Sequence, residues 1–136
     1  MAVRKVNHSR RIRSKTSTTL SKVGFGNIIE FKYNAKDVYD KTPMVFVLSH
    51  TSAGAGARIR TDTKKGKILN GINISYLREY IIEQLLEETN PKKLKSWPLY
   101  DKAFRTYKIS DMKRVKLIEY ETLPQRKQRL KNENKL

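Results

Sequence analysis

The side chains best suited to chemistry in this sequence are lysines and arginines, which gather in an N-terminal segment, a central loop and a C-terminal segment. Such cations bind phosphate groups, and each contact releases condensed counterions from a polyanion. The residues that we expect to contact nucleic acid or an acidic partner are Arg4, Lys5, Arg10, Arg11, Arg13, Lys15, Arg58, Arg60, Lys64, Lys65, Lys67, Arg126, Lys127 and Arg129. Because they lie in segments without regular patterning, we expect nonspecific contacts to phosphates rather than readout of base edges.

The charge balance of the whole chain points in the same direction. Among 136 residues, 30 are Lys or Arg and 13 are Asp or Glu, which gives a formal net charge of +17. A surface field of this sign attracts polyanions and raises their rate of encounter. DNA bound without sequence specificity is therefore the expected partner, with RNA or an acidic protein surface as the alternative.

Residue patterns typical of catalysis or metal binding are absent from the sequence. His8 and His50 do not share a helical spacing, and the chain has no cysteine. The aspartates of the polar turns follow no metal-ligand spacing; they are Asp37, Asp40 and Asp62. Disulfide frameworks need cysteine, and structural zinc sites need cysteine or histidine at regular spacings. We therefore expect a non-enzymatic protein without a cofactor or a metal.

The elements that must position these cations can be read from the spacing of the apolar residues. In GNIIEFKY, residues 26–33, every second side chain is apolar on one side, which is the pattern of a strand. The predicted strands are residues 26–33, 44–50, 68–74, 104–109 and 114–120. Residues 76–89 place leucine and isoleucine on one stripe and glutamate on the opposite face, which predicts an amphipathic helix.

This order of elements predicts a mainly β fold, namely a small, partly open barrel of the SH3-like or OB-like kind with one inserted helix. The barrel domain would span residues 25–121. Residues 1–24 contain seven cations and no acid. They also lack apolar periodicity, so we expect a basic arm that is flexible when free. Residues 122–136 are expected to form a basic tail.

Two short motifs inside the predicted barrel have a structural interpretation. Pro43 presets a turn, and Asp40 can accept backbone N–H bonds at the entry to the next strand. Asn73 and Tyr76 could line a ligand pocket, but polar side chains beside a glycine bend more commonly bond to the backbone. Gly71 itself suggests a bulge or a close backbone approach. The residues expected to have a structural role are Tyr39, Asp40, Pro43, Gly71, Asn73 and Tyr76.

The stretches FKY, YDKTPMVFVL, NGINISYL, KAFRTYKI and KRVKLIEY follow one another between residues 25 and 120. In this order they resemble a group of small virion-associated proteins of tailed bacteriophages. The positions that carry the resemblance are Phe31, Tyr33, Tyr39, Asp40, Pro43, Gly71, Asn73, Tyr76 and Leu77. This chain departs from the group in lacking a proline-rich helix start and in its longer Gly/Ala/Lys loop. The resemblance implies a role near the portal, the neck or the capsid interior.

These observations predict a non-enzymatic structural component of a phage particle. The barrel would dock on other virion proteins in a multi-copy assembly, while the basic arms contact DNA or acidic protein surfaces. No apolar run approaches the roughly 20 residues that span a bilayer, so we expect no membrane partner. The expected location is the virion, after synthesis in the host cytoplasm.

Two other functions remain open at this point. Basic extensions on a small barrel also suit an RNA-binding protein of the ribosomal type. A weaker alternative is a ribonuclease, because TPMVFVLSH resembles a strand of barrel-fold ribonuclease toxins. Those toxins usually carry arginine where this chain has Thr42.

Overall fold

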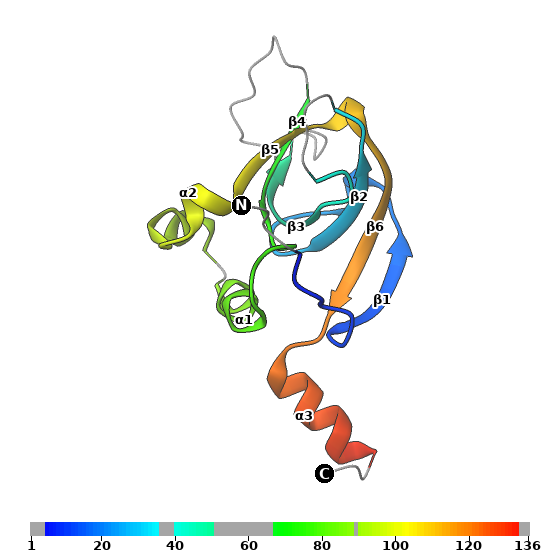
Figure 1. Ribbon diagram of the computed structural model, residues 1–136, viewed down its shortest axis with the longest axis vertical. Helices are drawn as coiled ribbons and strands as arrows, with labels where there is room; N and C mark the ends of the chain where they lie inside the picture. Colours follow the sequence, from blue (N-terminus) through cyan, green and yellow to red (C-terminus); the bar gives the residue numbers. More distant parts are fainter. Residues whose placement is uncertain (1–4, 36–39, 51–66, 89, 134–136) are drawn as a thin grey trace.

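The computed structural model describes residues 5–35, 40–50, 67–88 and 90–133, which form a mainly β fold. Six strands make one antiparallel sheet in the order β1-β6-β2-β3-β4-β5 (Figure 1). The strands are β1 (Ile12–Ser17), β2 (Ile28–Tyr33), β3 (Met44–His50), β4 (Ile68–Asn73), β5 (Phe104–Lys108) and β6 (Met112–Tyr120). The predicted mainly β class is confirmed. The sheet is open, with β1 and β5 at its edges, and its assignment to the SH3-like or OB-like kind stays a prediction.

Strand β1 lies in the segment that the sequence assigned to a flexible arm, and that prediction is wrong for residues 12–17. β1 pairs with β6, and Lys15 lies opposite Ile118. Five of its six side chains are exposed. The segment therefore lacks the apolar alternation by which a half-buried strand is recognised. The other five strands agree with the predicted ones to within two residues at either end.

Helix α1 (Glu79–Glu87) confirms the predicted amphipathic helix, although it begins three residues later than expected. It buries Ile82 and Leu85 against one face of the sheet. The sequence predicted a single helix, and the structure adds several short ones around the sheet. These are η1 (Leu20–Lys22), η4 (Pro91–Ser96), α2 (Tyr100–Ala103) and η5 (Ile109–Asp111).

Helix α3 (Leu123–Asn132) occupies most of the segment predicted as a basic tail. It begins with a capping box, in which the Thr122 hydroxyl accepts from the Gln125 N–H and the Gln125 side chain accepts from the Thr122 N–H. Pro124 suits the first turn because it lacks an N–H that would need a partner there. The helix projects away from the sheet beyond the end of β6 (Figure 1). Residues 123–132 of the predicted basic tail are therefore helical.

A hydrophobic cluster covers each face of the sheet. On one face, Ile28 and Ile118 pack with Ile82 of α1. On the other face, the rings of Phe31 in β2 and Tyr107 in β5 lie 5.1 Å apart, centroid to centroid. Because β2 and β5 are not neighbours in the sheet, this contact requires the sheet to curl, as Figure 1 shows.

The glycine in β4 marks a close approach between two strands. A Cβ atom at Gly71 would collide with Val45 and would lie 2.9 Å from the carbonyl oxygen of Phe46. Real Cβ atoms are not found at such distances, so the strand pair needs glycine here. The predicted close backbone approach is confirmed.

The polar motif residues form a buried lock at the entry to β3. Asp40 accepts from the Thr42 N–H at 3.1 Å and from the Asn73 side-chain amide at 3.2 Å. The Asn73 carbonyl oxygen in turn accepts from the Ser75 N–H at 2.9 Å. These bonds confirm the structural roles predicted for Asp40 and Asn73. Pro43 is buried and Tyr76 is half-buried, while Tyr39 lies outside the described residues.

Candidate nucleic-acid interface

Arg11 was expected to contact nucleic acid, but its side chain is a buried clamp inside the molecule. The residue is 1% exposed. Its Nε donates to Glu79 at 3.2 Å, and its Nη1 donates to the Glu83 carboxylate at 2.9 Å and to the Glu121 carbonyl oxygen at 2.8 Å. Burial alone would lower the pKa of Arg11, but the hydrogen bond to Glu83 and the charge of Glu79 raise it above its ordinary value. The predicted phosphate contact is corrected, because this guanidinium is already enclosed by carboxylates.

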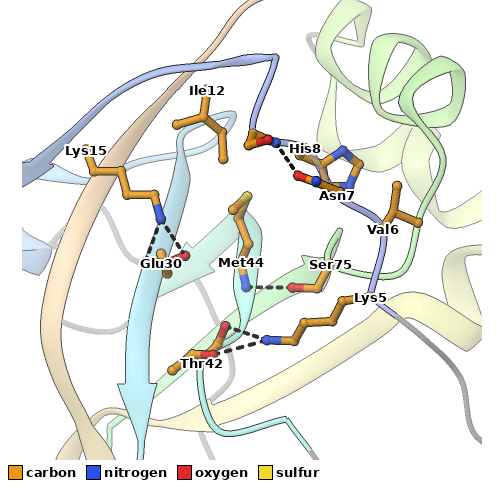
Figure 2. A pocket seen from close by; sticks show the side chains of 11 residues that line it. Lys5, Val6, Asn7, His8, Ile12, Lys15, Glu30, Thr42, Met44 and Ser75 are labelled. Carbon is orange, nitrogen blue, oxygen red and sulfur yellow. Dashed lines mark hydrogen bonds and ion pairs between the residues drawn. The ribbon is translucent and has the colours of Figure 1, made fainter.

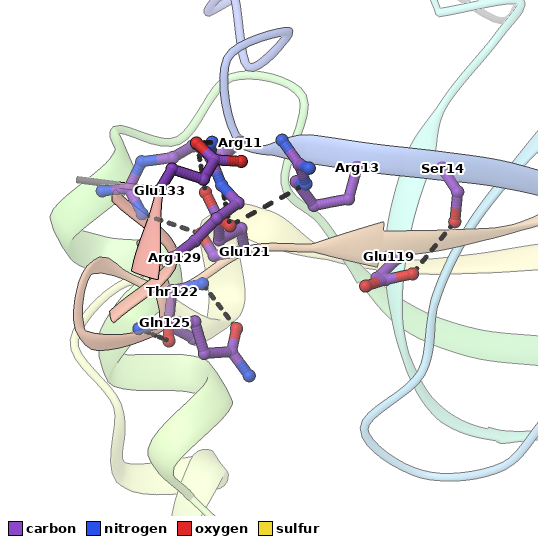
Figure 3. Close-up of polar contacts among 9 residues, drawn as sticks. All are labelled: Arg11, Arg13, Ser14, Glu119, Glu121, Thr122, Gln125, Arg129 and Glu133. Atoms are coloured by element: carbon purple, nitrogen blue, oxygen red, sulfur yellow. Dashed lines mark hydrogen bonds and ion pairs between the residues drawn. The ribbon is translucent and has the colours of Figure 1, made fainter. Parts of the chain in front are cut away.

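Two further predicted cations meet at the buried carboxylate of Glu121 (Figure 3). Arg129 of α3 donates to it through Nε at 2.8 Å, and Arg13 of β1 lies 3.8 Å away. The hydrogen bond from Arg129 is the main cause that lowers the pKa of Glu121 below its ordinary range. Glu121 thus connects the C-terminal helix to the sheet edge. Both arginines are already paired with a carboxylate of the same chain, which leaves less of their charge available to a partner.

Lys5 and Lys15 are also paired with acids of the same chain. The Lys5 ammonium lies 2.8 Å from Asp40, and the Lys15 ammonium lies 3.2 Å from Glu30. Both lysine side chains remain more than two-fifths exposed, so their expected contact with a partner stays a prediction.

The remaining predicted contact residues fall into two groups. Arg10, Lys67 and Lys127 are exposed and Arg126 is half-buried, and none of them forms an ion pair with a residue that the structure describes. The others lie outside the described residues; they are Arg4, Arg58, Arg60, Lys64 and Lys65.

Strand pairing also brings together a group of lysines on the sheet, none of which was among the contact residues predicted from the sequence. In the β2–β6 ladder, Lys32 lies directly opposite Lys113, and Lys116 lies opposite Glu30. Side chains alternate along a strand. Phe31 and Tyr33 belong to the core on one face, so Lys32 and its cross-strand neighbours occupy the other face. We call Lys32, Lys113 and Lys116 the lysine face.

The lysine face carries charge that the described part of the chain leaves without a partner. Lys32 and Lys113 are exposed and Lys116 is half-buried, and none of the three forms an ion pair with a described residue. Like charges directly opposite each other on a sheet are destabilising. A bound phosphate would relieve this repulsion, because it supplies the missing negative charge between the two ammonium groups.

A β-bulge interrupts β6 beside this pair. The register shifts between Glu30 and Lys32, and Arg114 has φ +55°, the left-handed conformation that non-glycine residues rarely adopt. Bulges redirect side chains and are over-represented near functional sites. Arg114 is exposed and follows Lys113 directly, so its guanidinium adds a fourth cation to this end of the sheet.

His8, the histidine of the N-terminal segment, is buried next to the Arg11 clamp. It is 4% exposed, and its Nε2 lies 3.2 Å from the carbonyl oxygen of Ile74. Its ring meets that of Tyr120 edge to face at 5.8 Å between centroids. Burial lowers the pKa of His8 below its ordinary value of 6.5, although the Ile74 carbonyl and Glu79 act in the opposite direction.

The described residues contain no cluster of three or more histidine or acidic side chains that could hold a metal ion. Among the helices of this same part of the chain, none has the length and apolar composition that a membrane crossing requires. Comparisons of the chain with protein-family models, with curated proteins and with solved structures found no match.

Proposed function

We propose that this protein is a non-enzymatic structural component of a phage particle that binds packaged DNA through the lysine face. The observation that carries the binding role is the direct opposition of Lys32 and Lys113, with Lys116 on the same face. The resemblance of residues 25–120 to small virion proteins supports placing that role in a phage particle.

Contacts on this face would be to phosphates. Lysine ammonium groups are point charges without the planar fork that reads base edges, so they suit binding that is independent of sequence. The lysines of the face are mounted on two paired strands, which fixes the spacing of their Cα atoms while leaving the side chains able to adjust. The basic segments at the two ends would add further contacts through Arg10 and Lys127, which are exposed.

Salt dependence of DNA binding tests the proposed role directly. If three phosphate contacts are made by the lysine face, replacing Lys32, Lys113 and Lys116 together by Gln makes the slope of log affinity against log salt shallower by about 2.7. A matched control replaces Lys22, Lys93 and Lys131 by Gln, since these exposed lysines lie elsewhere and their loss changes the net charge equally. Equal slopes for the two variants would refute the lysine face as the binding site.

Two further measurements separate the proposed location from the alternatives. Mass spectrometry of purified phage particles should detect this chain at several copies per particle, and its absence would refute the structural role. Competition with RNA and DNA of the same length should favour DNA or show no preference. A strong preference for RNA would shift the assignment to an RNA-binding protein.

A further inference from the structure

A pocket of about 430 Å³ is shown in Figure 2. Its lining residue Glu30 lies on the same sheet face as Lys32, because the two are separated by one residue on β2. One wall is the N-terminal segment 5–9, which is held to the body by a hydrogen bond from the Val6 N–H to the Ser75 carbonyl oxygen. The opposite wall comes from the sheet, with Ile12 and Lys15 on the β1 side and Glu30 and Met44 on β2 and β3. The pocket therefore forms only because the N-terminal segment is ordered across the sheet.

The lining of this pocket combines apolar and hydrogen-bonding side chains. Val6, Ile12 and Met44 supply apolar surface. Asn7 and Ser9 are exposed at the rim, where their side chains can donate and accept hydrogen bonds. Flat heterocycles with polar edges, such as nucleobases, need both kinds of surface: apolar contact on the ring face and hydrogen bonds around the edge.

The charged rim of the pocket suits a base more than a phosphate. Lys15 binds both carboxylate oxygens of Glu30, at 3.3 and 3.2 Å, so an incoming anion would meet a carboxylate as well as an ammonium group. Together the two side chains present an acceptor and a donor side by side. A carboxylate accepts hydrogen bonds from the exocyclic amino groups of bases.

The pocket and the lysine face share a border at Glu30. Lys116 lies opposite Glu30 on β6, and Lys32 lies two residues further along β2, which is a distance of about 7 Å along the strand. Phosphates lying on the lysines would therefore leave an attached base within reach of the pocket. A base inside a duplex would first have to leave its stack, a cost that a base of a single strand largely avoids.

We propose that the pocket receives one unpaired nucleobase of a single strand whose phosphates lie on the lysine face. This inference rests on the proposed function and adds the class of ligand, namely single-stranded nucleic acid. DNA and RNA strands share this chemistry, and both are included in the test.

The test compares the affinity of the full chain for a labelled single strand with its affinity for a duplex of equal length, by fluorescence anisotropy at one salt concentration. The single strand should bind about tenfold more tightly, because its bases can enter the pocket without first being unstacked and unpaired from a duplex. Separate DNA and RNA single strands show which source is preferred. Equal affinity for strand and duplex would overturn the inference, while salt-dependent binding would leave the proposed function standing. Absence of any binding would overturn both.

Two variants locate the effect. Ser9→Trp fills the pocket mouth without removing a side-chain hydrogen bond to a described residue, and it should abolish the single-strand preference while keeping duplex binding. Thr16→Trp is the control, because Thr16 is an exposed residue of β1 that lies opposite Leu117 and so faces the other side of the sheet. Loss of the preference in both variants, or in neither, would overturn the inference.

A spectroscopic measurement on the unmodified chain guards against a folding defect in Ser9→Trp. The chain has three methionines. With methyl-labelled methionine, addition of a single strand should shift the Met44 signal more than the Met112 signal, because Met112 packs in the cluster on the other face. A Met44 signal that does not move while the strand binds would overturn the inference.

Discussion

The N-terminal segment and the lysine face use the same kind of side chain in opposite ways. In the N-terminal segment, several cations that stand close together in sequence find a carboxylate in the fold, as Arg11 does with Glu79 and Glu83. On the lysine face, Lys32 and Lys113 are far apart in sequence, and the fold brings them together although neither forms an ion pair with a described residue.

This difference shows that the density of charge along a sequence is a poor guide to the field that a partner meets. A crowded basic segment attracts the acids of its own chain first, because those acids are present at high effective concentration. Cations on neighbouring strands cannot move to the nearest acid in this way, since backbone pairing fixes which side chains face each other. Among the described residues, most cations of the N-terminal segment are therefore paired with a carboxylate, while the three lysines of the lysine face are not.

The largest expected effect comes from breaking the buried clamp. Replacing Arg11 by Ala leaves Glu79 and Glu83 without their cation; because Glu79 is partly exposed and can be hydrated, we expect a cost at the low end for a broken buried pair, about 3 kcal/mol. The free energy of unfolding, measured in urea, should fall by this amount. Arg10→Ala is the matched control, because the neighbouring arginine is exposed and its loss should cost less than about 0.5 kcal/mol. Equal effects of the two substitutions would show that the N-terminal segment is not anchored as described.

The next effect separates the two regions by function. Replacing the three lysines of the lysine face by Gln should lower the affinity for duplex DNA about a hundredfold at low salt, since three phosphate contacts are lost. Replacing Lys5, Arg13 and Lys15 by Gln removes the same charge from the N-terminal segment. Those side chains already pair with acids, so the loss of affinity should be several times smaller. The reverse order would restore the N-terminal segment as the main contact surface.

Much of the fold follows from local pattern, and the misses have physical causes. The alternation in residues 28–33 and the apolar run in residues 44–48 identify strands because their own side chains fill the two hydrophobic clusters of the sheet. β1 is not recognised in the sequence because it is an edge strand whose side chains are mostly exposed, so it has no apolar alternation. It forms a strand because it pairs with β6. For α3 a signal was present, since Thr122 and Gln125 have the spacing of a capping box.

The candidate site could not be predicted in the same way. Lys32, Lys113 and Lys116 each look like an ordinary solvent-facing residue of a half-buried strand. These lysines lie side by side only because β6 pairs with β2, and this contact between distant parts of the sequence is not encoded by any local pattern. The burial of Arg11 depends likewise on α1 packing over the sheet, which places two glutamates beside it.

A third prediction uses pH to test whether the N-terminal segment belongs to the interior. Because burial lowers the pKa of His8 in the folded chain, the unfolded chain binds a proton more readily below pH 6.5. Stability should therefore be lost as the pH falls through 6.5 towards the folded pKa, with Glu79 and Arg11 as the nearby charges. The urea midpoint of the unmodified chain should fall between about pH 7.5 and about pH 5.5 more than that of His8→Gln, which does not titrate. Parallel curves would place His8 in solvent.

The smallest effect concerns the repulsion on the lysine face itself. Lys32→Glu converts a pair of like charges into a pair of opposite charges across β2 and β6. The free energy of unfolding should rise by about 0.5 kcal/mol at low salt, and Lys32→Gln should give a smaller rise because it removes only the repulsion. Both gains should shrink as salt is added, since both side chains are exposed and screening weakens their interaction.

The same substitution should weaken DNA binding although it stabilises the fold. A protein gives up stability where unpaired charge serves a partner, so opposite changes in the two quantities are the sign of a functional site. Urea unfolding and DNA anisotropy on the three proteins, unmodified, Lys32→Gln and Lys32→Glu, measure both. If Lys32→Glu lowered stability below that of Lys32→Gln, Lys32 and Lys113 would not repel each other. The lysine face would then be an ordinary solvated surface.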